Sequence, residues 1–215
     1  MLSTFLPIFF TMFIVVDPIG LVPLYIGLTS RIPPDRKKGI IRNALIISFL
    51  VLLGFVFFGK HLLALLHIES GSFYIAGGIM LFIIAFEMLF GRPLHSKISE
   101  KEHSDPASDN AASIAIFPLA IPMLAGPGAL TAIILYSGGY YNGDEELSTS
   151  EISLMLVVSV FLVLVITGLV LRASDIVLKI LRETGVSVLE RIMGLILAGM
   201  SVQFVYDGIV RLGFH

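Results

Sequence analysis

Two long apolar segments of this chain are each interrupted by proline and glycine, and this pattern constrains the fold more than any other feature. The first segment runs from Leu2 to Leu28 and contains Asp17-Pro18-Ile19-Gly20. The second runs without charge from Ala111 to Gly143 and contains Ala125-Gly126-Pro127-Gly128. Proline removes a backbone donor and clashes with the preceding helical turn, and interrupted backbone at membrane depth survives only in protein or beside a wet cavity. A matched pair of interruptions in two halves of a chain points to a transporter binding site.

Composition places the chain among polytopic membrane proteins. Hydrophobic residues make up 56% of its 215 residues and charged residues only 14%, whereas a soluble domain carries roughly a quarter charged residues. The chain has no cysteine, which excludes disulfides and thiolate metal sites. The first segment has no basic leader and no small-residue cleavage site, so we expect a retained helix rather than a signal peptide.

Six segments are apolar and long enough to span a bilayer, since a spanning helix needs about 20 such residues. The fold class that we predict is an all-α membrane protein of six helices, with the first and fourth broken at mid-membrane. One long polar loop separates the third segment from the fourth. The predicted units are a first three-helix repeat (1–91), a cytoplasmic linker (92–110) and a second, inverted repeat (111–215). The six segments cover about 2–29, 39–58, 72–90, 112–140, 152–171 and 188–212.

The distribution of Lys and Arg predicts the orientation. Twelve of the fourteen basic residues lie in or beside the first-to-second, third-to-fourth and fifth-to-sixth connections, and only Lys60 and Arg211 lie on the other side. Cytoplasmic loops carry the excess of basic residues. We therefore expect a multi-pass inner-membrane protein whose two termini both face away from the cytoplasm.

The two halves resemble each other in sequence. Each has three spans, an odd number, so the second half must enter the membrane from the opposite face. Such inverted repeats are a common plan among secondary transporters. The matched positions are Pro18 with Pro127, Gly78 with Gly194, Ala85 with Ser201, and Glu87 with Gln203.

The interruptions could form a small polar site. A half-helix that begins at a break presents free N–H groups and a positive dipole end, while one that ends there presents free carbonyls. Together they suit a zwitterion, and glycine lets a ligand approach the backbone closely. A single such break would more simply be a packing kink; two matched breaks favour a site. The predicted substrate-binding residues are Asp17, Pro18, Ile19, Gly20, Ala125, Gly126, Pro127, Gly128, Thr131 and Gln203.

Two acidic residues fall within predicted spans and are the proton-coupling candidates. Asp17 could contact a substrate ammonium group or carry a proton, because burial disfavours the charged form of a carboxyl group. It could also cap the half-helix that follows. Glu87 could line the pathway with its repeat partner Gln203, or extend to the interface, or hydrogen-bond between helices.

These motifs resemble those of the MarC family of bacterial and archaeal inner-membrane proteins. The resemblance rests on the two interrupted segments and on Arg191-Ile192-Met193-Gly194-Leu195-Ile196-Leu197 with Val202-Gln203-Phe204, and it covers essentially the whole chain. It implies six spans and, by analogy with the SnatA-like branch of the family, transport of small neutral amino acids such as glycine and alanine.

The lead hypothesis is therefore a secondary transporter of small neutral amino acids, proton-coupled, whose halves rock around a shared site. One alternative is a non-transporting assembly or stress protein. Another is an intramembrane enzyme, against which stands the absence of Cys, of an intramembrane His and of hydrolase or metal motifs; converging ionisable side chains within the membrane would favour it. The expected partners are the lipid bilayer, a small zwitterion and protons, with no nucleic acid, metal or cofactor. A homo-oligomer is left open.

Overall fold

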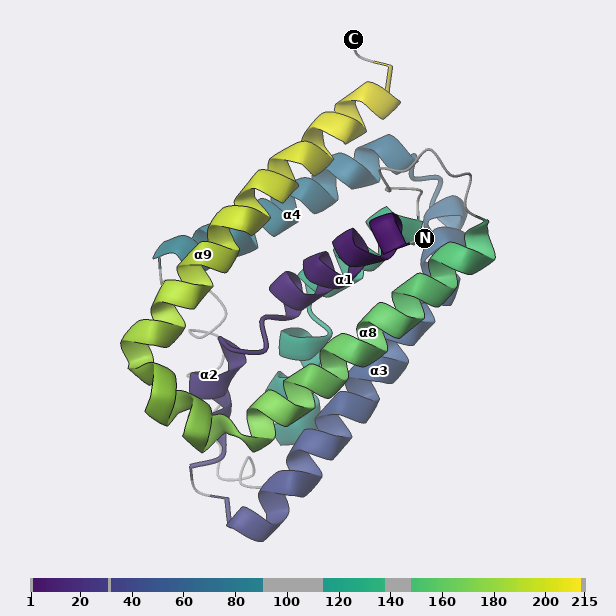
Figure 1. Ribbon diagram of the computed structural model, residues 1–215. Helices are drawn as coiled ribbons and strands as arrows, with labels where there is room; N and C mark the ends of the chain where they lie inside the picture. Colours follow the sequence, from purple (N-terminus) through teal and green to yellow (C-terminus); the bar gives the residue numbers. More distant parts are fainter. Residues whose placement is uncertain (1, 31, 91–113, 138–147, 214–215) are drawn as a thin grey trace.

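The computed structural model describes residues 2–30, 32–90, 114–137 and 148–213, and within these ranges every regular element is a helix. Figure 1 shows long helices packed side by side, with shorter helices between them. The predicted linker at 92–110 lies outside the described residues.

The first half contains four helices. The segment predicted as one span is two helices, α1 (Leu2–Val16) and α2 (Leu21–Leu28), bent by 40° at the break between them. α3 (Pro34–Leu65) begins with proline at its first position, where a missing N–H costs nothing. α4 (Ser70–Phe90) completes this half and closely matches the predicted third span.

The second half opens with an irregular helix. In η2 (Ala115–Leu124), Phe117 and Ile121 have extended φ and ψ angles. Each precedes a proline in the sequence, and the residue before proline avoids the helical region. The predicted fourth span is therefore divided between η2 and α7 (Pro127–Ser137).

Two long helices follow. α8 (Thr149–Arg172) starts with a capping box between Ser148 and Glu151. α9 (Ser174–Arg211) is interrupted at Arg182, whose φ is 55°, and its last part, Thr184–Arg211, is long and apolar enough to span a membrane. The segments predicted for the fifth and sixth spans thus both lie in long helices.

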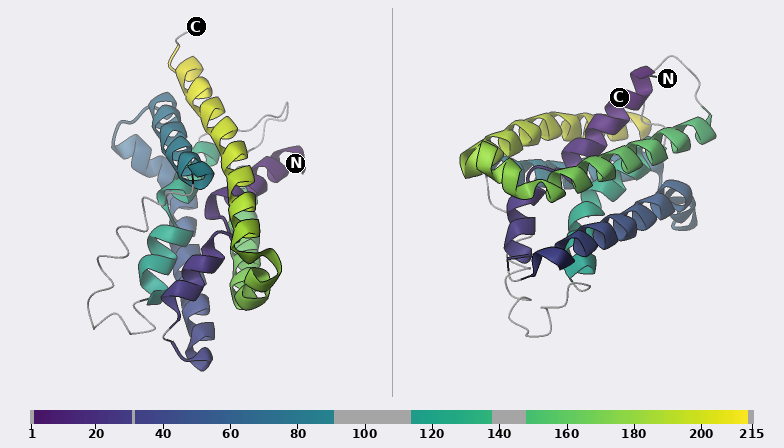
Figure 2. Two further views of the ribbon diagram at one scale, coloured as in Figure 1. Left: turned by 90° about the vertical axis from the view of Figure 1, so that its left-hand side faces the viewer. Right: turned by 60° about the horizontal axis from the view of Figure 1, so that its bottom comes forward.

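The helix pair α4 and α9 is held by a seam of small residues. The two helices run side by side along most of their length (Figures 1 and 2). A Cβ added at Gly78 would stand 2.8 Å from the Ser201 carbonyl oxygen, and one added at Gly194 would stand 3.0 Å from that of Ala85. Gly71 and Gly208 face each other in the same way, at 2.8–2.9 Å from one another's carbonyl oxygens. Small residues let helix backbones approach this closely.

The core and the outer surface are both apolar. α1, α3, η2, α7 and α8 share one buried cluster, and a second lies between α4, α7 and α9. Large hydrophobic side chains such as Phe58, Leu154 and Leu195 are at least 64% exposed, which fits a surface that meets lipid.

The described helices provide four or five candidate spans. Four helices among the described residues can cross a membrane by length and composition, or five if α1 and α2 together form one span. α7, an apolar helix of 11 residues, is too short to be counted by itself. The all-helical membrane fold is confirmed, while the six-span inverted repeat stays a prediction.

A cavity between two broken helices

The first break is organised by Asp17. This residue ends α1 with a φ of 46°, a region that few residues other than Gly, Asn and Asp enter. Its side-chain Oδ1 accepts the Gly20 N–H at 3.1 Å, and its carbonyl oxygen accepts the Leu21 N–H at 3.2 Å. Asp17 therefore supplies both the turn and the cap that start α2.

The second break is more open. Ala125 donates its N–H to Ala120 at 2.9 Å, which closes η2, and Pro127 then begins α7. The Gly126 carbonyl accepts the Leu130 N–H at 3.1 Å, so the first turn of α7 has its N–H groups directed back toward the break. A Cβ at Gly128 would meet Val15 at 2.7 Å and Ile84 at 2.8 Å, so glycine lets α7 touch both α1 and α4.

Both breaks line one cavity of about 480 Å³. Asp17 and Gly20 come from the first break, and Gly126, Pro127 and Gly128 come from the second. Helices α4 and α9 supply the remaining sides, together with Met123 of η2. A volume of this size lies within the range of small-molecule sites, roughly 300–1,000 Å³.

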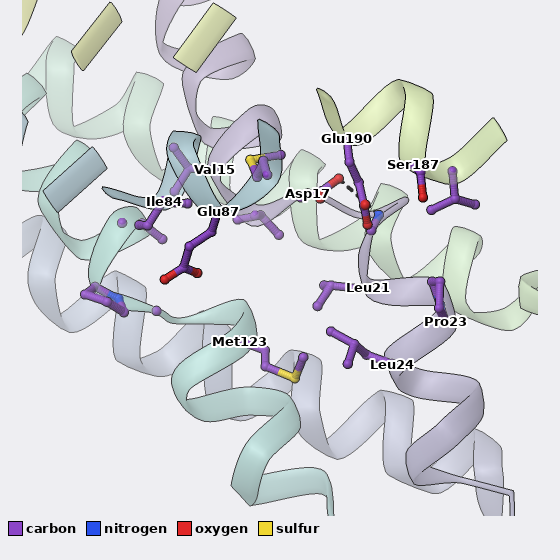
Figure 3. Close-up of a pocket in the computed structure, with 18 residues that line it drawn as sticks. Val15, Asp17, Leu21, Pro23, Leu24, Ile84, Glu87, Met123, Ser187 and Glu190 are labelled. Atoms are coloured by element: carbon purple, nitrogen blue, oxygen red, sulfur yellow. Dashed lines mark hydrogen bonds between the residues drawn. The ribbon is translucent and has the colours of Figure 1, made fainter. Parts of the chain in front are cut away.

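Three carboxylates face this cavity within otherwise largely apolar walls. Figure 3 shows Asp17 and Glu190 beside each other, while Glu87 enters from the α4 side. Glu190 Oε1 lies 2.8 Å from the place where a Cβ on Gly20 would stand, and a carboxylate oxygen of Asp17 lies closer still to that place. Both side chains are half-buried. No Lys, Arg or His lines the cavity in the part of the chain that the structure describes.

The cavity therefore has two different poles. The Asp17–Glu190 end presents two acidic side chains, while the start of α7 presents the N–H groups and the partial positive charge of a helix N-terminus. Between 2 and 213, in the described ranges, no group of three His, Asp or Glu side chains could hold a metal ion.

The predicted site residues divide into two groups. Asp17, Gly20, Gly126, Pro127 and Gly128 line the cavity, as does the proton-coupling candidate Glu87. The others lie outside its lining. Pro18 and Ala125 are buried and Ile19 half-buried beside the breaks; Thr131 is buried with its methyl group against Gly77; and Gln203 is exposed, donating to Asp207 Oδ1 at 2.9 Å.

Sequence reasoning missed Glu190, which stands beside Arg191 near the start of the predicted sixth span at 188–212. A signal was available. Glu190 belongs to a stripe on α9 at alternating steps of four and three residues, which is the spacing of one helix face. The other members of that stripe are buried: Gly194, Leu197, Ser201, Phe204 and Gly208.

Buried hydroxyl groups make a further set of contacts between helices. Thr11 Oγ1 and Tyr136 Oη are 2.7 Å apart, and Tyr136 also donates to the Pro7 carbonyl at 3.3 Å. Tyr74 donates to the Leu135 carbonyl at 2.8 Å. These contacts tie α1 and α4 to α7.

Apolar spans, a lipid-facing surface and broken helices around one cavity define an integral membrane protein. The model described as "MarC family integral membrane protein" matches residues 2–212, so the chain belongs to the MarC family, and the family predicted from the motifs is confirmed.

Several relatives match over nearly the full chain. A UPF0056 membrane protein of Archaeoglobus fulgidus is 36% identical, with 98% of this chain and 94% of the relative covered. One from Methanocaldococcus jannaschii is 34% identical, with 95% and 86% covered. The UPF0056 inner membrane protein YhgN of Escherichia coli is 35% identical, with 91% of each covered. No solved structure matches the chain.

Proposed function

We propose that this protein is a secondary transporter of small neutral amino acids such as glycine and alanine, coupled to protons, with its site between the two broken helices. The observation that carries the proposal is the two-pole cavity. Its acidic end suits an ammonium group, and the start of α7 suits a carboxylate. Such a cavity fits an α-amino acid, which carries both groups on one carbon.

The apolar walls fit the side chain of such a substrate. Val16, Leu21, Ile84 and Met88 line the cavity, and they offer contact to a methyl group but no partner for a further polar or charged group. The cavity is larger than glycine or alanine, so water would share it with the substrate.

The packing of α4 against α9 supports the inverted-repeat architecture. The sequence repeat places Gly78 on Gly194 and Ala85 on Ser201. If each residue is replaced by its partner in the other half, the observed Gly78–Ser201 contact becomes the Gly194–Ala85 contact, which is also observed. A two-fold pseudo-symmetry axis between the helices would produce this relation. We therefore keep the six-span plan, with repeats at 1–91 and 111–215, as part of the proposal.

Charge distribution gives the proposed orientation. Glu87 lies near the end of α4 that precedes the basic linker, and Glu190 lies near the start of the spanning part of α9, Thr184–Arg211, after the basic fifth-to-sixth connection. These connections are expected in the cytoplasm. The cavity would then open to the cytoplasm, with both termini outside and the hydroxyl contacts of Tyr74 and Tyr136 closing the outer side. The relative YhgN is named an inner membrane protein, which supports an inner-membrane location.

The direct test is transport by the purified protein in liposomes. We expect uptake of labelled glycine or alanine that responds to an imposed pH gradient. Asp17→Asn should remove this response, and if Asp17 handles protons, amino-acid exchange without a gradient should survive. Absence of uptake for every small neutral amino acid would contradict the proposal and favour the non-transporting assembly or stress protein.

The paired carboxylates also favour a second candidate, an intramembrane hydrolase. Two acids that share a site can activate water, as in aspartic proteases. The amino-acid transporter is preferred because the same cavity also contains the start of α7, which would be idle in an acid dyad. Incubation with apolar membrane-spanning peptides decides between them: cleavage that is lost in Asp17→Asn would support the hydrolase.

A further inference from the structure

Asp17 and Glu190 approach each other at the acidic end of the cavity. The two residues come from distant parts of the chain, the α1–α2 break and α9, and each has a carboxylate oxygen within 3 Å of the place where a Cβ on Gly20 would stand. We propose that Asp17 and Glu190 act as one cation-binding pair, which holds either a single proton or the ammonium group of the substrate. This inference rests on the proposed function for the identity of the substrate, but not for the pair itself.

The geometry of Gly20 supports the pairing. A side chain at this position would collide with oxygens of both carboxylates, so glycine is what allows the two groups to come together. The Gly20 N–H donates a hydrogen bond to Asp17 Oδ1. This hydrogen bond holds the Asp17 carboxylate next to the position that Glu190 reaches. Glu190 therefore approaches a carboxylate that is already fixed.

Among the described residues that line the cavity around the pair, none carries a positive charge. Within the described ranges, Glu87 on α4 is the other ionisable group that lines the cavity. η2 contributes Met123 to this lining, the second break contributes Gly126, and α7 contributes Pro127, Gly128 and Ala129. Tyr25 on α2, which follows Gly20, is buried. Asp175 and Arg191 on α9 are exposed. Two like charges in one half-buried site disfavour each other's ionised form, and such groups titrate as a unit. A cation that enters the cavity would relieve this repulsion.

The consequence is a specific form of coupling. When an ammonium group binds between the carboxylates, the proton that they share leaves for the water of the cavity, and the charge of the occupied pair stays the same. When the substrate leaves, a proton returns. Proton and substrate therefore compete for one place, which predicts exchange of one for the other across the membrane.

Infrared spectroscopy of the purified protein near neutral pH tests the pair without requiring transport. A protonated carboxyl group has a carbonyl band distinct from that of a carboxylate. We expect the wild-type protein to show this band, and we expect both Asp17→Asn and Glu190→Gln to lose it, because either change leaves a single acid that ionises. Addition of methylammonium, or of alanine, should diminish the band in the wild-type protein.

The control is Asp207→Asn, an acid-to-amide change on α9 outside the cavity lining, which should leave the band unchanged. Gly20→Ala keeps both acids but fills the space where they meet, so the band should weaken even though no acid has been removed. Size-exclusion profiles matching the wild type show that a variant is folded.

The outcomes separate this inference from the proposed function. Absence of the band in the wild-type protein, its loss in only one of the two acid variants, or its loss in Glu87→Gln alone would overturn the pair, whether or not alanine is transported. A band that both variants remove and that methylammonium diminishes would support the pair even if liposomes showed no amino-acid uptake.

Discussion

At the scale of single residues, Asp17 combines a backbone role with a chemical one. Its positive φ makes the turn between α1 and α2, and its carboxylate caps Gly20. Asparagine at this position can preserve both structural features, because it tolerates the left-handed region and its side-chain oxygen can accept the same hydrogen bond. Substitutions at Asp17 can therefore distinguish its structural role in the turn from the role of its acidic group.

We predict that Asp17→Asn leaves stability almost unchanged, whereas Asp17→Val destabilises the protein by about 1–3 kcal/mol, since a β-branched residue is strained at positive φ. Thermal unfolding in detergent measures the difference. Equal melting temperatures for the two variants would contradict the turn geometry described for this break.

At the scale of helices, the seam between α4 and α9 depends on residues without large side chains. Gly194 and Gly199 lie on the same helix but differ in surroundings. A Cβ at Gly194 would stand 2.8 Å from Met88 Cβ and 3.0 Å from the Ala85 carbonyl oxygen, while nothing lies within 4 Å of one at Gly199. The pair provides a matched comparison of identical substitutions.

We expect Gly194→Ala to destabilise the protein by about 1–3 kcal/mol, because the extra methyl group forces the helices apart. Gly199→Ala should instead be neutral or stabilising by up to about 1 kcal/mol, the helix-propensity gain of alanine over glycine. Melting temperatures in detergent compare the two variants, and a greater loss at Gly199 would refute the seam.

The contact between α1 and α7 gives a second prediction at this scale. Thr11→Val and Tyr136→Phe each remove the buried hydroxyl pair and should each cost about 0.5–1.5 kcal/mol. Because they break the same contact, the double variant should lose less than the sum of the two. A double-mutant cycle on unfolding measures this coupling, and strict additivity would show that the hydroxyl pair contributes nothing.

At the scale of the whole molecule, the proposed orientation can be tested by labelling, because the chain contains no cysteine. Ser187 lines the cavity and is exposed, whereas Ser159 on α8 is fully buried. We predict that a membrane-impermeant thiol reagent modifies Ser187→Cys from the cytoplasmic side and leaves Ser159→Cys unmodified from either side. Modification of Ser187→Cys only from the outer side would reverse the proposed orientation.

Part of the overall fold could be predicted from the sequence. The apolar segments and their interruptions follow from local chemistry, so the positions of α3, α4, α8 and the two breaks could be predicted. The irregular course of η2 could not be predicted in detail, since three closely spaced prolines allow several backbone solutions and packing selects one. The six spans and the linker at 92–110 stay predictions from the sequence.

The site divides in the same way. Asp17, Gly20 and Gly126–Gly128 could be predicted to border a shared cavity because each marks a break in its own segment. Glu190 and Met123 could not, because they reach the cavity only through contacts between elements far apart in the chain. Gln203 illustrates the converse: its match with Glu87 in the repeat suggested a shared site, yet it lies on an exposed face of α9.

By itself the sequence determined a membrane-embedded helical protein with two interrupted segments, because hydrophobicity, proline and glycine act on the chain locally. Only the tertiary structure decided that both interruptions border one cavity and that Glu190 meets Asp17 there. The shared cavity and the approach of Glu190 to Asp17 depend on how closely α4, α7 and α9 approach one another. This distance is set by packing between helices rather than by the residues of any single helix.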